Sequence, residues 1–578
     1  MNRAQHWARI IDALPESEER KLTQKKQRRY LPWIFQKIKK RLPSIMLLTM
    51  LNIAVCFANI QFALVTKSVV NSAIARDLEQ LKLAALVMIS LSLFRLAGNI
   101  LYQFLSVNVN EGLERDFKRA MLHVILRSDY SRISTHHSGD LIQRMDGDSA
   151  TVISGVMEFT SGITGIVTSL FAAVIALLQI APGFTIVCGC IMVLMSMTAL
   201  LFRRTLKQLN KDTSAANGRV RGYLHESISK LMVIQALDVG AEMEVRCDQV
   251  LDDRWAVRRK WRNVSILSRL GTNSINYVSY LATMLWCAWK LLSGAITYGD
   301  VTAITSLFAT ARSSATSLPR MLPQIFSVTA ACDRLMELED IPQQSVPDPE
   351  KVRAMYAGLK GFVAEHLTFS YDREPVLTDV CLTIPKGGLT VIIGQSGIGK
   401  STLLKLLLGL YRPQSGALWI DAADGRVPVD RSTRSLFSYA PQGNFLLSGT
   451  LRENLTYTNP QATDEQIREA LYVSAMDEYV ASLPQGLETV LLENGAGLSE
   501  GQAQRISLAR AILSGAPVLL LDEVTSALDA LTEKTVLERI CALPGKTCIA
   551  VTHRPAALAL ADQIIEVTEE GMTFKKCE

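Results

Sequence analysis

The chain has 578 residues, a formal net charge of +6 and a mean hydropathy of +0.18, with 48% hydrophobic residues. This hydropathy is high for a soluble protein of a length that allows two to four domains. The modest charge gives no support for a nucleic-acid-binding protein, so we expect no nucleic-acid partner. The ten cysteines lack the spacing of a metal site, and we interpret them as free thiols in a reducing compartment.

The first 42 residues form a polar, basic segment that lacks the pattern of a secretory signal peptide. Residues 30–40 combine Trp33, Ile34 and Phe35 with several lysines. Such a segment could form an amphipathic helix lying in the membrane interface.

Six apolar stretches that are long enough to cross a bilayer follow this segment. They lie near residues 44–66, 84–107, 152–179, 183–202, 265–293 and 299–326. The last of them is the most polar, since it carries many serines and threonines and Arg312. We therefore predict an all-α transmembrane domain of six helices over residues 1–335, with the lipid bilayer as a partner.

The distribution of charge predicts the orientation of these helices. The N-terminus and the long connections 111–150 and 203–262 are rich in lysine and arginine, whereas the connections 67–83, 180–182 and 294–298 are short and carry little charge. By the positive-inside rule the long connections and both termini are cytosolic. We expect a multi-pass protein of the cell membrane, the plasma membrane of a bacterium. The two long connections predict cytosolic helical extensions with breaks at 129–137 and 226–238.

Several arginines lie within the predicted spans. Arg95, near Asn99, falls in the middle of the second span, and Arg312 and Arg320 lie in or near the last. Charged side chains inside a membrane usually face a cavity or a partner, which allows an anionic or amphipathic substrate. A purely structural role is the alternative, and we favour it for Arg95 and Arg320.

A mostly polar segment with three prolines, residues 336–358, predicts a linker.

A phosphate-binding loop follows in the second half of the chain. An apolar strand at 389–393 leads into the pattern G-x-x-x-x-G-K-[ST], and a helix is predicted at 400–410. The residues of this loop are Gly394, Gln395, Ser396, Gly397, Ile398, Gly399, Lys400, Ser401 and Thr402.

The order of strand, loop and helix disfavours an ordinary glycine turn. The glycines let the backbone turn its N–H groups towards phosphate oxygens at a helix N-terminus. Lys400 is expected to reach the β- and γ-phosphates, and the Ser401 hydroxyl to coordinate Mg²⁺. A second strand, 518–521, ends in Asp522 and Glu523. We expect Asp522 to hold Mg²⁺ and Glu523 to polarise water, as in an α/β P-loop NTPase.

Further motifs resemble those of the ATP-binding cassette (ABC) family, in the family's order, over about residues 359–578. The stretch Leu498-Ser499-Glu500-Gly501-Gln502 resembles the signature sequence of that family. Gln442, after Ala440-Pro441, resembles the Q-loop of the family, and Ser526-Ala527-Leu528-Asp529 resembles its D-loop. His553 resembles its switch histidine, and Tyr371 resembles the aromatic residue that stacks on adenine.

The whole chain resembles an exporter-type half-transporter, in which six spanning helices precede one nucleotide domain. The resemblance implies ATP and Mg²⁺ as cofactors and ATP hydrolysis coupled to transport. It also implies that the tips of the cytosolic extensions dock on nucleotide domains. Family transporters need two copies of each domain, so a dimer is expected. We favour a homodimer, with a heterodimer of two different half-transporters as the alternative.

The resemblance also implies roles for single residues. Ser499, Gly501 and Gln502 would touch the nucleotide of the partner, with Asp529 nearby. Glu523 would be the general base, and His553 would hold the γ-phosphate and orient the water. Gln442 would contact Mg²⁺ and report to the tip helices. One residue departs from the family pattern, because the signature has Glu500 where glycine is usual.

Three classes of function compete. The first is an exporter of a lipid, a peptide or an amphipathic drug-like small molecule, and the second is an importer built on the exporter fold. The third is a soluble ABC ATPase of the chromosome-maintenance type. The six predicted spans disfavour the third class, which would carry long coiled coils between its motifs. The sequence does not identify the transported molecule.

Overall fold

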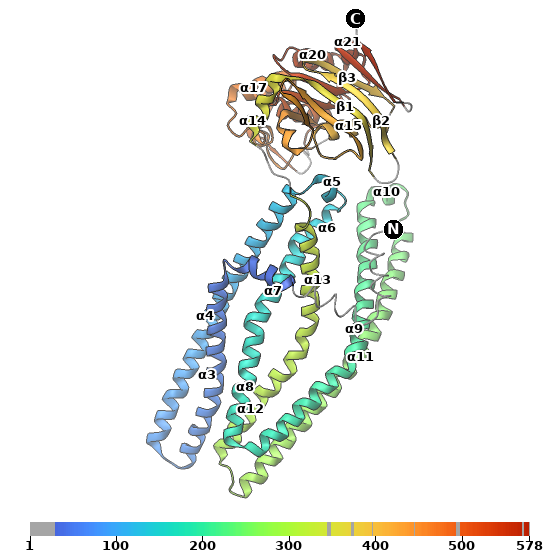
Figure 1. Cartoon of the computed structure of the whole chain (residues 1–578). Helices are drawn as coiled ribbons and strands as arrows, with labels where there is room; N and C mark the ends of the chain where they lie inside the picture. The colour runs from blue at the N-terminus through green and yellow to red at the C-terminus, as the bar shows by residue number, and fades with distance from the viewer. Residues whose placement is uncertain are drawn as a thin grey trace. The chain divides into compact units, whose positions relative to one another are not determined.

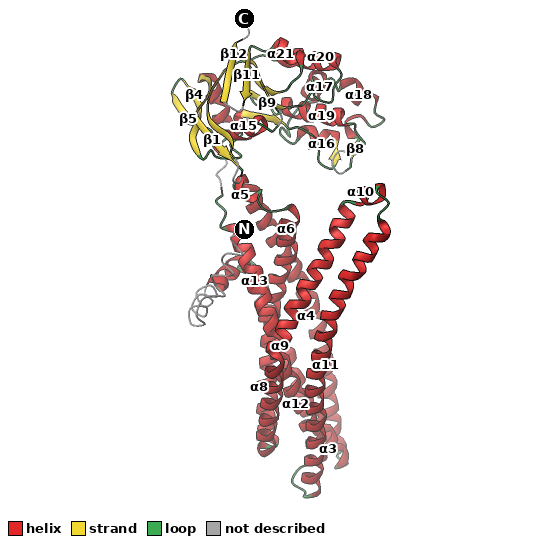
Figure 2. Ribbon diagram, turned by 90° about the vertical axis from the view of Figure 1, so that its right-hand side faces the viewer, coloured by secondary structure: helices red, strands yellow, loops and turns green. Residues whose placement is uncertain are grey.

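The computed structural model describes residues 29–343, 348–371, 375–395, 397–443, 445–492, 497–568 and 571–576. The chain divides into two compact units. One consists of Met1–Leu122 and Ser138–Glu339, and the other of His123–His137 and Asp340–Glu578. The first unit is helical, whereas the second combines sheets and helices (Figures 1 and 2). The predicted fold class, a helical transmembrane domain followed by an α/β domain, is confirmed.

Long helices dominate the first unit (Figure 1). After a helical segment at residues 29–38, the elements are α3 (Leu42–Ile74), α4 (Leu78–Arg127), α6 (Ser138–Gln143), η1 (Arg144–Asp148), α7 (Ser149–Met157), η2 (Glu158–Gly162), α8 (Ile163–Ile180), α9 (Pro182–Ser229), α10 (Leu231–Ala236), α11 (Gly240–Leu292), α12 (Tyr298–Ser317), η3 (Leu318–Met321) and α13 (Leu322–Glu339). The helices α4, α9 and α11 contain 50, 48 and 53 residues. These lengths exceed what a bilayer requires, as predicted for helices with extensions beyond the membrane.

All six predicted spans are helical. Three helical segments of the described chain are long and apolar enough to cross a membrane, namely 42–74, 78–127 and 138–180. A shorter apolar stretch, Pro182–Met192, begins the fourth predicted span. The regions 265–293 and 299–326 are too polar for the same criterion, because α11 and α12 mix apolar residues with serine, threonine and asparagine. Their crossing of the membrane stays a prediction.

The helical segment at residues 29–38 is anchored in the helical unit through its aromatic side chains. Trp33 and Tyr30 are buried beside α4, α7 and α13. The Trp33 Nε1 donates to Glu339 Oε2 at 2.7 Å, and the Tyr30 hydroxyl donates to Asp333 Oδ1 at 2.9 Å. The side chain of Phe35 is exposed. The interfacial helix expected here therefore turns Trp33 into the bundle, because its polar N–H finds an acidic partner there.

Both predicted breaks in the long helices lie where the sequence places them. The helix α4 ends at Arg127, the short helix α5 (Tyr130–Ile133) follows, and α6 begins at Ser138. The second break separates α9 from α11 and contains α10. The predicted linker at 336–358 is partly helical, since α13 runs to Glu339 and α14 spans Pro349–Ala354.

Two sheets form the frame of the second unit (Figure 2). The larger has the order β12-β11-β3-β10-β9-β6 and is parallel except for β12. Its strands are β3 (Gly388–Gly394), β6 (Phe437–Ala440), β9 (Val518–Asp522), β10 (Thr547–Val551), β11 (Gln563–Thr568) and β12 (Gly571–Lys576). The antiparallel sheet has the order β2-β1-β4-β5, with β1 (Leu359–Ser370), β2 (Pro375–Pro385), β4 (Ser415–Ala422) and β5 (Gly425–Pro428). The short strands β7 (Gly449–Thr450) and β8 (Val490–Leu491) pair separately.

The parallel sheet has a hydrophobic core on each face. Successive residues of a strand point to opposite faces, so Val391 and Ile392 belong to different cores. One core packs α15 (Lys400–Leu407) between the two sheets, and the other packs α19 (Glu500–Leu513), α20 (Ala530–Cys541) and α21 (Pro555–Leu560). Burial on both faces explains why the strands at 389–393 and 518–521 are continuous apolar runs.

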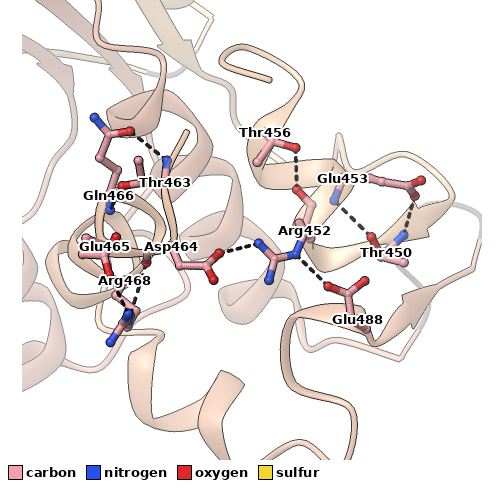
Figure 3. A network of polar contacts seen from close by, with 10 residues as sticks. All are labelled: Thr450, Arg452, Glu453, Thr456, Thr463, Asp464, Glu465, Gln466, Arg468 and Glu488. Carbon is pink, nitrogen blue, oxygen red and sulfur yellow. Dashed lines mark hydrogen bonds and ion pairs between the residues drawn. The ribbon is translucent and has the colours of Figure 1, made fainter. Parts of the chain in front are cut away.

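A helical layer with its own core precedes α19. It contains α16 (Leu451–Thr456), α17 (Asp464–Val473) and α18 (Asp477–Ser482). Capping boxes begin α16 and α17, and the Arg452 guanidinium bridges Asp464 and Glu488 at 2.6 Å each (Figure 3). This network lies on the surface, where ion pairs add little stability. The short 3₁₀ segments η4 (Met355–Gly358), η5 (Arg431–Leu436) and η6 (Gly486–Glu488) complete the described elements of this unit.

Phe362 gives a test of the core between the sheets. Its side chain is fully buried, and its ring lies 5.3 Å from that of Phe437. We expect Phe362→Ala to destabilise the second unit by about 3–5 kcal/mol, because the cavity is only partly refilled. Differential scanning fluorimetry of the purified full-length chain measures the effect. Phe445→Ala, at a residue that is 57% exposed, is the matched control, and an equal loss from both variants would contradict this placement.

Candidate functional site

The phosphate loop connects β3 to α15 through residues that adopt left-handed backbone conformations. Gly394, Gly397 and Gly399 have φ values of 148°, 86° and 105°. A Cβ atom at Gly394 would lie 2.5 Å from the Val567 carbonyl oxygen, so glycine is required there by space as well as by φ. Ile398 packs against the core between the sheets. Ser396, which the sequence also assigns to the loop, lies outside the described residues.

Lys400 occupies the centre of this loop and is 6% exposed. Its Nζ donates to the carbonyl oxygens of Gly394 at 2.6 Å and of Gln395 at 2.8 Å. Burial lowers the pKa of Lys400, while the charges of Glu523 and Asp522 act in the opposite direction. A third N–H of the ammonium can donate to an anion, as expected for a phosphate-binding lysine.

The serine of the loop and the acid at the end of β9 are in direct contact. The Ser401 hydroxyl donates to Asp522 Oδ1 at 2.8 Å, and the Asp522 side chain is 2% exposed. A hydroxyl and a carboxylate together fit Mg²⁺, which usually takes one or two carboxylates and completes its shell with phosphates and water. Among the described residues there is no group of three or more histidine, cysteine or acidic side chains that could hold a metal alone. The donor set therefore fits a metal that arrives with a phosphorylated ligand.

Tyr439 is a member of the site that sequence reasoning missed. It lies on β6, and its hydroxyl donates to Asp522 Oδ2 at 3.0 Å. Burial, together with the charge of Asp522, raises the pKa of Tyr439 and keeps the phenol protonated as a donor. No motif around Tyr439 points to this role, because the contact exists only once β6 pairs with β9.

Glu523 has a strained backbone and a hydrogen-bonded side chain. Its φ is 51°, a left-handed value that is uncommon for a residue with a side chain. Its N–H donates to the Val551 carbonyl oxygen at 3.0 Å, and Gln442 Nε2 donates to Glu523 Oε2 at 2.6 Å. Local strain of this kind concentrates at functional sites.

Strand register brings His553 to the same edge of the sheet. Val551 of β10 pairs with Asp522 of β9 and with Ile392 of β3. Because these strands are parallel, His553, Glu523 and Gly394 all follow at their carboxyl ends, where ligands of α/β sheets bind. His553 is exposed there. The adjacent Arg554 donates to the Ser526 carbonyl oxygen, a link between two loops that the sequence did not predict.

Tyr371 is joined to the phosphate loop through Thr402. The two hydroxyl oxygens lie 3.1 Å apart, and the Tyr371 side chain is 48% exposed. Its ring makes edge contacts with Phe369 and Tyr411, at centroid distances of 5.0 and 5.2 Å. An exposed ring beside the loop has the geometry needed to stack on a base.

The signature residues begin α19, and Gly501 among them lies against the D-loop. Ser499 caps α19 in a reciprocal pair with Gln502, with N–O distances of 2.8 and 3.2 Å. A Cβ at Gly501 would lie 3.0 Å from the Ala527 carbonyl oxygen. Asp529 caps α20 by accepting from Thr532 N at 3.0 Å, and this hydrogen bond lowers the pKa of Asp529. Within the described part of the chain, no hydrogen bond joins the signature residues to the phosphate loop.

The first tip, which contains α5, belongs to the same compact unit as the ATP-binding domain. Arg431 Nη1 donates to the Arg127 carbonyl oxygen at 2.9 Å, and the Tyr130 and Tyr411 rings lie 5.6 Å apart. The second tip, α10, exposes apolar side chains instead. Met232 is 82% exposed, with Leu231 and Val233 also exposed beside it.

The chain matches two family models. The model of the ABC transporter transmembrane region covers residues 45–314, and that of the ABC transporter covers residues 377–526. The mycobactin import ATP-binding/permease protein IrtB of Mycolicibacterium smegmatis is 30% identical over 73% of this chain and 75% of its own length. An ATP-dependent lipid A-core flippase of Desulfotalea psychrophila is 27% identical over 85% of this chain and 87% of its own.

The fold also matches a solved structure. A bacterial Atm1-family ABC exporter with ATP bound superimposes with a TM-score of 0.77 at 20% identity, covering 93% of this chain and 94% of the other. At this level of identity the similarity concerns the fold.

Proposed function

The chain belongs to the ABC transporter family, and on this premise we propose that it is an ATP-driven exporter of a lipid, a peptide or an amphipathic drug-like molecule. Its exporter-type architecture and its ATP-binding domain are those of a membrane-embedded transport ATPase. The observation that carries the proposal is the cluster of Lys400, Ser401, Asp522, Glu523 and Gln442 at the carboxyl edge of the parallel sheet. We propose the plasma membrane of a bacterium as its location, with both termini in the cytosol, where ATP is available.

The cluster supports a division of roles. Lys400 would bind the β- and γ-phosphates, since its ammonium lies inside the glycine loop. Ser401 and Asp522 would hold Mg²⁺, which neutralises charge on the phosphates when bound, and Tyr439 would fix the Asp522 carboxylate. Glu523 would accept the proton of the attacking water. Gln442, which donates to the Glu523 carboxylate, would contact Mg²⁺, and His553 at the same edge would orient the water.

Two observations support a dimer. The signature residues Ser499 and Gln502 cap α19 through each other, and Gly501 lies against Ala527 in the D-loop of its own chain. The second tip exposes Met232 and its apolar neighbours. Both features would be completed by a second copy that supplies a phosphate loop and a docking surface. We propose a homodimer, with a heterodimer of different half-transporters as the second candidate.

Replacing Glu523 separates nucleotide binding from hydrolysis. In Glu523→Gln the amide oxygen still accepts from Gln442, but it cannot take a proton from water. We expect ATP binding to be retained and steady-state hydrolysis to fall by at least about 100-fold. Lys400→Ala is the contrasting variant, and we expect it to weaken ATP affinity by about ten-fold or more, because a charged phosphate contact is lost. Near-normal turnover of Glu523→Gln would remove Glu523 as the base.

Glu500 is predicted to slow ATP hydrolysis at the nucleotide site that it faces in the dimer. It lies exposed in the first turn of α19, in the segment that would meet a partner's triphosphate. At roughly 7 Å and an effective dielectric constant of about 20, each pair of like charges costs about 2 kcal/mol, part of which the helix N-terminus offsets.

We expect Glu500→Gly to raise ATPase activity or to lower the ATP concentration that it requires. Glu500→Gln removes the charge and keeps the size of the side chain, so it tests whether the charge alone accounts for the effect and should change activity in the same direction. A decrease of activity in both variants would show that the carboxylate promotes hydrolysis.

Assembly and direction are tested with the purified chain. In nanodiscs we expect the purified chain to form a stable two-fold dimer with ATPase activity. In inside-out vesicles we expect ATP-dependent accumulation of a substrate from a panel of lipids, peptides and drugs. A monomer, or a dimer that hydrolyses ATP only with a second half-transporter co-expressed, would favour the heterodimer. ATP-dependent loss of substrate from the vesicle interior would support the importer, which the IrtB relative makes the second candidate function.

A further inference from the structure

Three tyrosines from distant parts of the sequence form a continuous line of ring contacts in the second unit. Tyr371 follows β1, Tyr411 lies between α15 and β4, and Tyr130 begins α5 in the first tip. The Tyr371 and Tyr411 rings are 5.2 Å apart at an interplanar angle of 90°. The Tyr411 and Tyr130 rings are 5.6 Å apart at 84°. Both are edge-to-face contacts of the favourable type.

The Tyr411 ring is held at the centre of this line. It also contacts Phe369, at 5.4 Å between ring centroids. Phe369 is 4% exposed and belongs to the core between the sheets. Tyr411 therefore has one fixed contact in the core and two contacts with segments at the surface.

The tip is fastened on the N-terminal side of Tyr130. Arg431 donates to the carbonyl oxygens of Arg127 and Leu126, at 2.9 and 3.5 Å, and so satisfies the C-terminal carbonyls of α4. On the same side Asp129 N donates to the Pro342 carbonyl oxygen at 3.2 Å. These bonds hold the backbone next to Tyr130 in place within the second unit.

At the other end of the line, Tyr371 is held by one hydrogen bond and two ring contacts. Its hydroxyl reaches Thr402, in the first turn of α15, while about half of its side chain stays exposed. Removing Tyr411 would leave this ring with the Phe369 contact and the Thr402 hydrogen bond alone, and so less restricted in its rotamer. A base that stacks on Tyr371 would then have to fix the ring itself, at a cost in affinity.

We propose that Tyr411 and Tyr130 are positioning residues that connect the adenine-stacking ring of Tyr371 to the first tip, so that base binding and the docking of the tip stabilise each other. This inference rests on the proposed function, in which Tyr371 stacks on the adenine of ATP. This connection would respond to the base of the nucleotide. It is separate from the contact of Gln442 with Glu523, which lies at the phosphate end of the site. Because binding linkage is reciprocal, a loosened tip must weaken base binding by the factor with which a bound base tightens the tip.

The experiment compares a ligand that has a base with one that has none. Full-length protein in nanodiscs, carrying Glu523→Gln to prevent turnover, is titrated with ATP and with inorganic tripolyphosphate. We expect Tyr130→Ala and Tyr411→Leu each to weaken ATP binding by roughly two- to ten-fold, the range of one aromatic ring contact. Tripolyphosphate affinity should stay unchanged, since its contacts are with the loop around Lys400.

Conservative variants and a distant tyrosine provide the controls. Tyr130→Phe and Tyr411→Phe keep the rings and should restore ATP affinity to within about two-fold. Tyr472→Ala, at an exposed tyrosine of α17 whose ring faces Arg539, should change neither affinity.

Two results would overturn the proposal: unchanged ATP affinity in Tyr130→Ala, or equal losses for ATP and tripolyphosphate. A parent protein that binds neither ligand would instead contradict the proposed function.

Discussion

The parallel register of β3, β10 and β9 is the constraint on which the rest of the second unit depends. Val551 pairs with Ile392 on one side and with Asp522 on the other, which aligns the ends of the three strands. A one-residue slip would turn each strand's buried side chains to the opposite core and would separate Ser401 from Asp522. The hydrophobic cores on the two faces therefore fix the geometry of the polar cluster at the edge.

Charge explains how such a cluster is tolerated. A buried ammonium is costly unless it is hydrogen-bonded and has opposite charges nearby. Lys400 has two carbonyl acceptors, and the carboxylates of Asp522 and Glu523 favour its charged form. Asp522 in turn accepts from Ser401 and Tyr439. These bonds hold the ligand-binding groups in position, and the strained Glu523 is anchored through both its backbone and its side chain.

The two tips of the long helices differ in what their side chains contact. The first tip is part of the nucleotide-binding unit of its own chain, through Arg431 and the Tyr130–Tyr411 contact. The second tip keeps Met232 and its apolar neighbours exposed. The first tip is thus held on its own nucleotide-binding unit, whereas the second tip leaves an apolar surface exposed in the described chain.

The sequence alone determined the phosphate loop, the acids at the end of β9, the order of the family motifs and the breaks at both tips. These features are local, since each depends on a short run of residues with a fixed backbone geometry or a clear hydrophobic pattern. Only the tertiary structure decided that Tyr439 holds Asp522, that Gln442 holds Glu523, that Trp33 turns into the bundle and that Tyr130 meets Tyr411. Each of these contacts joins side chains far apart in the chain, and their proximity arises from strand pairing and helix packing, which no local pattern encodes.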